Sequence, residues 1–210
     1  SFEKIIDHHC FYVDKTKFIK EWWESRDDVT LITRPRRFGK TLTMQMLECF
    51  FSLKYTGKGT LFEGLDIWKE EEYRKLQGSF PVISLSFAAV KQTNFEEVKQ
   101  RIYQIITDLY QDYHFIKDSG KLTDVERLYF ESISPNMRES DATYALYELS
   151  RFLNCYYGKK VIILLDEYDT PMQEAYTNGY WNEMSSFTRS LFHAAFKTNP
   201  YLERGILTGI

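Results

Sequence analysis

Two short polar segments, each placed directly after a mainly apolar one, contain the residue types that phosphate chemistry needs. The first, 34–41, follows residues 29–33, and the second, 166–169, follows residues 161–165. The glycine, lysine and hydroxyl of the first segment can hold a triphosphate and place an oxygen on Mg²⁺. The carboxylates of the second can hold the same Mg²⁺ and activate a water molecule. Together they predict nucleotide binding and hydrolysis.

The first segment reads RPRRFGKT. Gly39 lets the backbone approach a phosphate closely, and the start of the following helix offers unpaired N–H groups to an anion. Lys40 would reach the β- and γ-phosphates, and the Thr41 hydroxyl would coordinate Mg²⁺. Arg34 stands where the usual P-loop pattern has its first glycine, so the pattern alone is incomplete. The predicted nucleotide-binding set also includes the neighbours Arg36, Arg37, Phe38 and Leu42.

The arginines of this segment have two interpretations. Arg36 or Arg37 can contact phosphate oxygens in forked geometry. Alternatively, the arginines pair with Asp166, Asp169 or other carboxylates and brace the loop.

In the second segment, Asp166 is expected to bind Mg²⁺ directly or through a water molecule. Glu167, beside it, would position and polarise the attacking water and is the predicted catalytic carboxylate together with Lys40. Asp169 either orients a neighbouring group or caps a helix beside Pro171.

The elements that must position these segments alternate along the chain. Asp14 is expected to cap a short helix, and Gly158 to end another as a left-handed cap. Residues 116–140 are interpreted as an insertion with one short helix. Residues 1–28 are interpreted as a helical segment that leads into the domain. Strands are expected at 29–33, 80–87, 160–165 and 204–209; helices after the Gly-Lys-Thr turn, around 68–77, from 95 to 113, at 141–157 and near 180–197.

This alternation predicts an α/β fold with a mainly parallel sheet that helices cover on both faces. Runs such as 161–165 are typical of strands buried on both sides. Ligands of such sheets bind beyond the carboxyl ends of the strands, where both polar segments lie. We therefore expect the two segments to meet.

The chain resembles the bacterial AAA-ATPase-like family, a group of P-loop proteins close to the archaeal and STAND-type ATPases. The matching stretches are 11–16, 33–42, 61–65, 164–171 and 203–210, in order along nearly the whole chain. The resemblance implies a three-layer P-loop NTPase fold, with Lys40 and Thr41 as the Walker A pair and Asp166 and Glu167 as the Walker B pair. It makes Arg34 a family trait.

The resemblance has further implications. Thr208 falls where such ATPases place a polar sensor of the γ-phosphate; the alternative is a strand-end hydroxyl bonded to the backbone. Members often continue into a nuclease-like domain of the PD-(D/E)XK type, as a fused or partner domain that is absent here. The sequence assigns no arginine finger: Arg189, on a predicted helix, and Arg204, before the last predicted strand, could each act in cis or from a neighbouring subunit of a homo-oligomer. Whether Asp14-Lys15-Thr16 lines the nucleotide site or caps a helix stays open.

Length, composition, net charge and cysteine content limit the kinds of protein that this chain can be. The 210 residues suit one domain, 43% hydrophobic and 27% charged, as in globular proteins. A net charge of -3 argues against a chain dedicated to nucleic acid, although a local basic patch is compatible with it. Three widely spaced cysteines favour reduced thiols in the cytoplasm, and no apolar run is long enough for a membrane span. Residues 205–210 have the pattern of a buried strand, so we expect a longer natural protein.

The expected reaction is Mg²⁺-dependent hydrolysis of ATP to ADP and phosphate. One alternative is a nucleotide-operated switch with little turnover. Another is a kinase for a small acceptor, which a water-activating Glu167 disfavours. A third is a DNA-associated module of a defence or mobile-element protein, which only the family analogy supports. The pair His8-His9 with Cys10 does not predict a metal site, because adjacent ligands rarely converge on one ion.

Overall fold

The structure is a computed structural model that describes residues 1–35 and 37–210. The strands are β1 (Val29–Thr33), β2 (Val82–Ser86), β3 (Val161–Asp166) and β4 (Leu202–Gly209). The helices before β3 are α1 (Phe2–Asp7), α2 (Lys17–Ser25), α3 (Lys40–Phe51), α4 (Glu71–Arg74), α5 (Phe95–Asp112), α6 (Asp124–Ser132) and α7 (Glu139–Tyr157). After β3 come α8 (Thr170–Asn178) and α9 (Trp181–Phe192), the latter extended by a π-helical turn at His193–Lys197. Short 3₁₀ turns lie at Leu53–Tyr55, Gly59–Phe62, Asp66–Lys69 and His114–Ile116.

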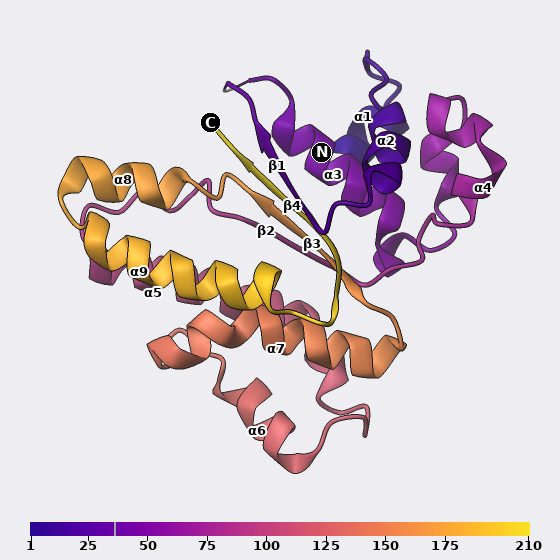
Figure 1. Cartoon of the computed structure of the whole chain (residues 1–210). Coiled ribbons are helices and arrows are strands. Elements are labelled where there is room, and N and C mark those ends of the chain that lie inside the picture. Colours follow the sequence, from indigo (N-terminus) through magenta and orange to yellow (C-terminus); the bar gives the residue numbers. More distant parts are fainter. Residues whose placement is uncertain (36) are drawn as a thin grey trace.

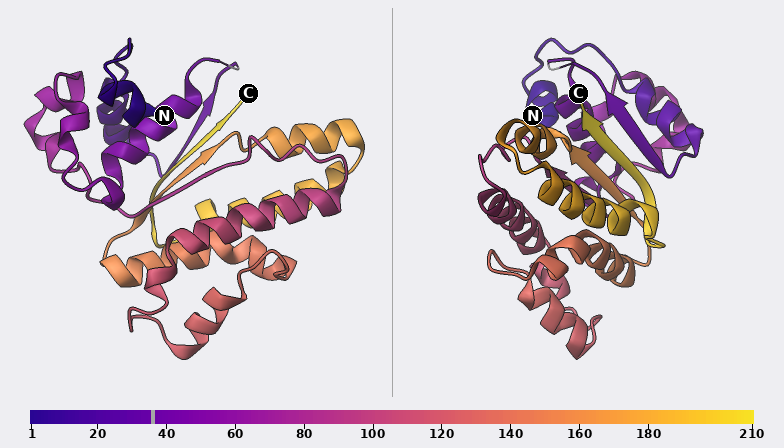
Figure 2. Two further views of the ribbon diagram at one scale, coloured as in Figure 1. Left: turned by 180° about the vertical axis from the view of Figure 1, so that it is seen from behind. Right: turned by 60° about the vertical axis from the view of Figure 1, so that its left-hand side comes forward.

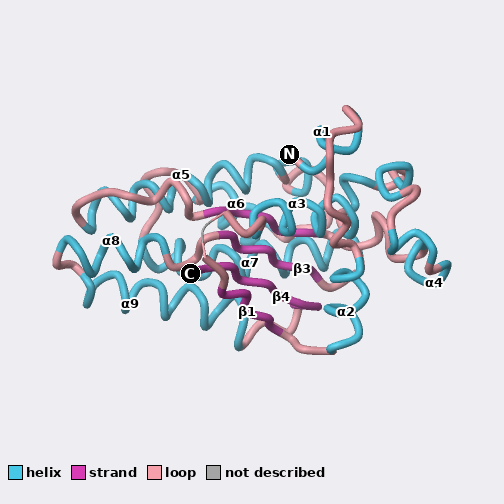
Figure 3. The backbone as a smooth tube through the Cα atoms, turned by 90° about the horizontal axis from the view of Figure 1, so that it is seen from above, coloured by secondary structure: helices cyan, strands magenta, loops and turns pink. Residues whose placement is uncertain are grey.

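The four described strands form one sheet in the order β1-β4-β3-β2, and every pair is parallel. Figure 3 shows the strands side by side, with β1 at one edge. The α/β class and the parallel sheet predicted from the sequence are confirmed. The strand beside both β1 and β3 is β4, the last in the chain, whereas β2 pairs only with β3.

Helices cover both faces of this sheet (Figures 1 and 2). On one face, α1, α2 and α3 pack over an apolar cluster that includes Phe50, Phe51, Ile162 and Ile206. On the other, α5, α7 and α9 pack over a larger cluster that includes Ile163, Leu165, Leu149 and Phe187. All six residues of β3 are buried, because alternate side chains enter the two clusters.

The N-terminal part is joined to the sheet by a buried arginine. Arg204, on β4, donates hydrogen bonds to the carbonyls of Trp22 and Trp23 at the end of α2, at 3.4 and 2.7 Å. Its guanidinium lies 4.7 Å from the centre of the Trp23 ring. A guanidinium that is stacked and hydrogen-bonded in this way holds α2 against β4. Because it binds α2, Arg204 is not exposed as an arginine finger would need to be.

Several expected elements differ in detail. The helix expected around 68–77 is reduced to α4 after a 3₁₀ turn, and α8 was expected only in the alternative that makes Asp169 a helix cap beside Pro171. Asp14 does not cap α2: Thr16 occupies the N-cap position, and Asp14 accepts hydrogen bonds from Thr16 instead. Gly158 does end α7 with a positive φ of 66°, as expected.

None of the helices within residues 1–35 and 37–210 combines the length and the hydrophobicity of a transmembrane span.

Candidate functional site

The two polar segments meet at the carboxyl edge of the sheet. β1 leads into the loop 34–39 and then α3, while β3 ends at Asp166. The Thr41 hydroxyl, in the first turn of α3, donates a hydrogen bond to Asp166 Oδ2 at 2.7 Å, although the residues are 125 positions apart. The expectation that the two segments meet is confirmed at this contact.

Asp166 is held on both of its oxygens. Its side chain is almost fully buried, and Oδ1 accepts a hydrogen bond from the hydroxyl of Thr208, which is completely buried. Thr208 reaches Asp166 because β4 lies between β1 and β3, with Thr208 opposite Ile32 of β1. Two hydroxyl donors from two other elements therefore fix the orientation of this carboxylate.

Glu167 follows at a sharp turn of the chain. Its φ of 51° is in the left-handed region, which is uncommon for a non-glycine residue. Two hydrogen bonds hold Glu167 at this turn: its N–H donates to Thr208 Oγ1 at 3.2 Å, and its Oε2 accepts from the Thr170 hydroxyl at 3.2 Å. Glu167 is therefore half-buried in a defined position beside Asp166.

An open cavity of about 460 Å³ joins the two segments. Its lining combines Glu167 with five residues of the first segment and helix start: Arg37, Gly39, Lys40, Thr41 and Leu42. All six were predicted as catalytic or nucleotide-binding residues. The cavity therefore brings positive groups and a carboxylate to one space at the end of the sheet.

The loop after β1 ends in a glycine and leads into a helix start without a capping side chain. Gly39 precedes the helix with a φ of 79°, and no side chain caps the helix start. A helix start without a capping side chain presents unpaired N–H groups and the positive end of the helix dipole. The Lys40 ammonium folds back to donate to the carbonyls of Arg34 and Pro35, the latter at 3.2 Å.

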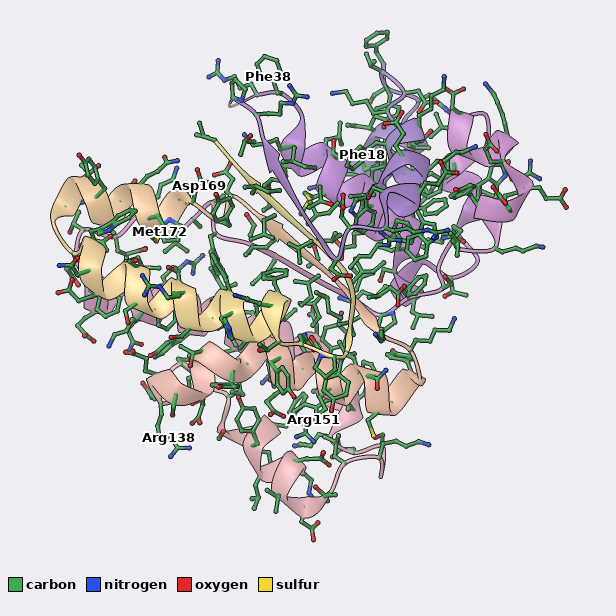
Figure 4. The ribbon with its side chains drawn as sticks, in the orientation of Figure 1. Phe18, Phe38, Arg138, Arg151, Asp169 and Met172 are labelled. Carbon is green, nitrogen blue, oxygen red and sulfur yellow. The ribbon has the colours of Figure 1, made fainter. Side chains whose placement is uncertain are left out.

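The remaining predicted residues of the loop are distributed differently. Arg36 lies outside the described residues. Phe38 is 62% exposed at the loop that follows β1 (Figure 4) and lines a second cavity, of about 730 Å³, beside β1. Among residues 1–35 and 37–210, no ion pair joins Arg34 or Arg37 to a carboxylate, so the bracing interpretation finds no support in these two arginines.

Of the two alternatives for Asp169, the helix cap holds for its position but not for the bonds of its side chain. It occupies the N-cap position of α8 without a side-chain capping bond. Its Oδ2 accepts from Gln173 Nε2 at 2.7 Å and from the Ile210 N–H at 2.9 Å. Asp169 thus connects the start of α8 with the residue after β4. Figure 4 shows Asp169 near the C-terminal end of the chain. Gly209 permits this approach, since a Cβ there would lie 2.7 Å from Asp169 Oδ1.

The donor set fits a magnesium ion shared with phosphates. The Thr41 hydroxyl and the Asp166 carboxylate offer the oxygen ligands that Mg²⁺ prefers. Within the described ranges, no group of three or more His, Cys, Asp or Glu side chains could hold a metal ion alone. Mg²⁺ is usually bound through one or two carboxylates plus substrate phosphates, so a site with a single buried carboxylate agrees with that use.

The sequence leaves the role of residues 14–16 open, and the structure places Lys15 beside the loop after β1 while Asp14 and Thr16 bond residues 66–67. Lys15 lies so close that a Cβ added to Gly39 would be 3.3 Å from its Nζ. Lys15 also lines the 730 Å³ cavity together with Lys40. No periodicity or spacing in the sequence signals this approach, because it joins an irregular N-terminal segment to the loop after β1.

Comparison with known proteins assigns the chain to a family. A family model described as "Predicted AAA-ATPase" matches residues 1–210. An uncharacterized protein in the vnfD 5' region of Azotobacter chroococcum mcd 1 is 25% identical over 201 residues, which cover 95% of this chain and 34% of that protein. The chain thus spans about a third of the length of that relative. No solved structure matches this chain. Because the family model covers the whole chain, this protein belongs to the predicted AAA-ATPase family.

Proposed function

We propose that this chain binds ATP with Mg²⁺ and hydrolyses it to ADP and phosphate as a P-loop ATPase domain of a larger protein. The contact between Thr41 and Asp166 carries the proposal, because it joins the two predicted magnesium ligands at 2.7 Å. The cavity that adds Lys40 and Glu167 to the same space supports it further. Membership of a predicted ATPase family agrees with both.

Each residue then has a defined task. The N–H groups at the start of α3 and the Lys40 ammonium hold the β- and γ-phosphates, after Lys40 leaves the carbonyls of Arg34 and Pro35. Thr41 and Asp166 hold Mg²⁺, which when bound neutralises the charge that develops on the phosphate oxygens. Arg37, which lines the same cavity, adds a second positive group.

Glu167 is the proposed general base. A water molecule attacks the γ-phosphorus, its proton passes to the Glu167 carboxylate, and the bond between the γ-phosphorus and the bridging oxygen breaks to leave ADP. The hydrogen bonds at the Glu167 N–H and Oε2 would keep the carboxylate beside the cavity during this step. Thr208 binds both Asp166 and the Glu167 backbone and so supports the magnesium ligand and the base together.

Calorimetric titration with ATP and GTP, each with Mg²⁺, tests the binding step. The wild-type protein should bind ATP, and Lys40→Ala should lose binding by about a hundredfold or more, since a charge-assisted phosphate contact disappears. Glu167→Gln should keep the affinity and slow phosphate release at least about a hundredfold. Equal turnover in the wild type and both variants would overturn the assignment. Binding without turnover in the wild type would indicate a nucleotide-operated switch instead.

A further inference from the structure

The turn between β3 and α8 carries two carboxylates that line different cavities. Glu167 lines the 460 Å³ cavity together with Thr41. Asp169 lines a separate cavity of about 430 Å³ together with Met172 and Ile210. Figure 4 shows Asp169 and Met172 at the start of α8. Of the two carboxylates, Glu167 is therefore the one placed to meet a nucleotide, and Asp169 can influence the reaction only through the turn.

This turn, residues 167–170, is bound to the end of β4 at three successive positions. The Glu167 N–H donates to the Thr208 hydroxyl at 3.2 Å, and the Tyr168 N–H donates to the Thr208 carbonyl at 3.0 Å. Asp169 Oδ2 accepts from the Ile210 N–H at 2.9 Å. Residues 208–210 therefore determine where the backbone that carries Glu167 lies.

Close packing supports these hydrogen bonds. A Cβ at Gly209 would lie 2.7 Å from Tyr168 Cε1 and from Asp169 Oδ1, so a side chain there would push the turn away from β4. The Tyr168 ring packs edge-on against Phe192 of α9, with 6.1 Å between the ring centres. The turn is thus held between β4 and α9, where dense packing leaves its backbone little freedom to move.

The side chain of Thr170 holds the Glu167 carboxylate itself. Thr170 is the first residue of α8 and is only 5% exposed. Its hydroxyl donates to Glu167 Oε2 at 3.2 Å, and its N–H donates to the Glu167 carbonyl at 3.2 Å. Among residues 1–35 and 37–210, Glu167 Oε1 accepts no hydrogen bond. The two oxygens of this carboxylate therefore differ: α8 binds Oε2, whereas Oε1 can meet a ligand in the cavity.

We propose that the first turn of α8 positions the base for hydrolysis. Thr170 holds Glu167 Oε2 and Asp169 holds the turn against β4, so that Glu167 Oε1 is the oxygen that accepts the proton of the attacking water. This inference rests on the proposed function. It adds Thr170 and Asp169 as positioning residues and assigns the proton to one named atom.

The proton transfer to Oε1 is balanced as follows. A lone pair of the water oxygen forms the bond to the γ-phosphorus, and a proton of the water passes to Glu167 Oε1 while the O–H electron pair stays on the water oxygen. The bond from the γ-phosphorus to the bridging oxygen breaks, and its electron pair leaves with ADP. Because the transfer needs hydrogen-bond distance between the water and Oε1, a carboxylate that can rotate is a poorer base.

Steady-state ATP hydrolysis by Thr170→Val tests the bond to Oε2. Valine keeps the shape of the buried side chain but removes the donor, so kcat should fall about tenfold, while KM for Mg²⁺-ATP should change by no more than about twofold. Thr170→Ser keeps the donor and should recover most of the rate. Thr170→Ala also lacks the donor and should resemble the valine variant.

Thr143→Val is the matched control for packing. Thr143 is 8% exposed and lies near the start of α7, where its hydroxyl donates to the Ser140 carbonyl at 3.0 Å. Its kcat should stay within about twofold of the wild type. Urea unfolding of each variant establishes that the compared proteins are folded under the assay conditions.

The Glu167→Gln background shows whether Thr170 acts through the base. There, Thr170→Val should change the remaining rate by less than about twofold, since the group that Thr170 positions no longer accepts the proton. A tenfold loss in this background, or in Thr143→Val, would assign the effect to packing and overturn the inference. Wild-type kcat in Thr170→Val and Thr170→Ala would overturn it as well.

Asp169→Ala and Gln173→Ala separate the two bonds of Asp169 Oδ2. Besides the Ile210 N–H, this oxygen accepts from Nε2 of the exposed Gln173 at 2.7 Å. Asp169→Ala should lower kcat about tenfold because it releases the turn from β4. Gln173→Ala removes only the bond within α8 and should stay within about twofold of the wild type. Equal losses in the two variants would overturn the role of Asp169.

Failure of this inference can be told apart from failure of the proposed function. Wild-type turnover in Glu167→Gln would overturn Glu167 as the base and with it the proposed hydrolytic site. A slow Glu167→Gln variant beside a Thr170→Val variant of wild-type kcat would overturn only the positioning role of Thr170.

Discussion

The hydroxyl of Thr208 donates a hydrogen bond to the carboxylate of Asp166 across the boundary between β4 and β3. The same oxygen accepts from the Glu167 N–H at 3.2 Å. One buried hydroxyl thus connects the proposed magnesium ligand with the backbone of the proposed base. This relationship depends on the strand order, because only β4 lies beside both β1 and β3. It gives Thr208 a positioning role, and its expected contact with the γ-phosphate stays a prediction.

Thr208→Val should separate this role from packing. Valine keeps the shape of threonine but leaves a buried oxygen of Asp166 and the Glu167 N–H without this partner, so we expect the free energy of unfolding to fall by about 1–3 kcal/mol. The rate of ATP hydrolysis at saturating ATP should fall about tenfold, with a smaller change in affinity. Denaturant unfolding and a phosphate-release assay measure the two effects.

The control for this variant is Thr188→Val in α9. Thr188 is also buried, but its hydroxyl donates to the carbonyl of Met184 in its own helix at 2.8 Å. Turnover should be unchanged there, and Thr208→Ser should recover most of the wild-type rate. A loss of turnover in Thr188→Val as large as that in Thr208→Val would contradict the positioning role.

Magnesium dependence should report on the Thr41–Asp166 pair. Thr41→Val removes the hydroxyl ligand, so the Mg²⁺ concentration needed for half-maximal turnover should rise roughly tenfold or more, whereas Thr41→Ser should stay near the wild type. Removal of Mg²⁺ with a chelator should abolish hydrolysis in all three proteins. Identical Mg²⁺ titration curves for Thr41→Val and Thr41→Ser would rule Thr41 out as a ligand.

The local features of the fold and the meeting of the two polar segments could be predicted from the sequence, whereas the other side-chain contacts between distant segments could not. The apolar run 161–165 and the cap at Gly158 predict β3 and the end of α7 because each depends on neighbouring residues. α8 has a weaker pattern, although Pro171 near its start and Gly179 after its end, with a φ of 82°, are usable signals.

Within the site, sequence spacing identified the loop and the two carboxylates but not what orients them. Thr208 lies 42 residues from Asp166, and Lys15 reaches Gly39 from a segment without regular structure. Such contacts follow from strand order and from the anchoring of Asp14 and Thr16 to residues 66–67. Neither the strand order nor this anchoring can be predicted from hydrophobic periodicity, because periodicity indicates only which face of a single helix or strand is buried.

The three cysteines should differ in reactivity. Cys49 lies in α3 within the apolar cluster, and burial raises the pKa of its thiol to about 11. Cys10 and Cys155 are exposed. At pH 8 an alkylating reagent should therefore modify Cys10 and Cys155 within minutes and Cys49 only after unfolding, because the thiolate is the reacting form. Mass spectrometry of peptides counts the labels, and rapid labelling of Cys49 in the native protein would contradict the packing of α3.

The pH dependence of stability should report on Glu126, far from the proposed site. Hydrogen bonds from the Thr123 backbone and hydroxyl, together with Arg151, lower the pKa of the Glu126 carboxyl. Figure 4 shows Arg151 in the region of α6 and α7, away from the loop that carries Phe38. Because the folded-state pKa is depressed, the stabilisation is complete above the ordinary glutamate pKa, about 4.3, and is lost as the pH falls through the lowered value.

Glu126→Gln should therefore lower the free energy of unfolding at pH 7 by about 1 kcal/mol, and the difference from the wild type should shrink as the pH falls below the ordinary glutamate pKa. Glu131→Gln, in the same helix, removes an exposed partner of Lys117 at 3.5 Å and should change stability by at most a few tenths of a kcal/mol. Urea unfolding at several pH values measures both. ATP affinity should be the same in the two variants, since neither residue lines the cavities at the loop. A difference between Glu126→Gln and the wild type that grew towards low pH would show that Glu126 is not held as a carboxylate by Thr123 and Arg151.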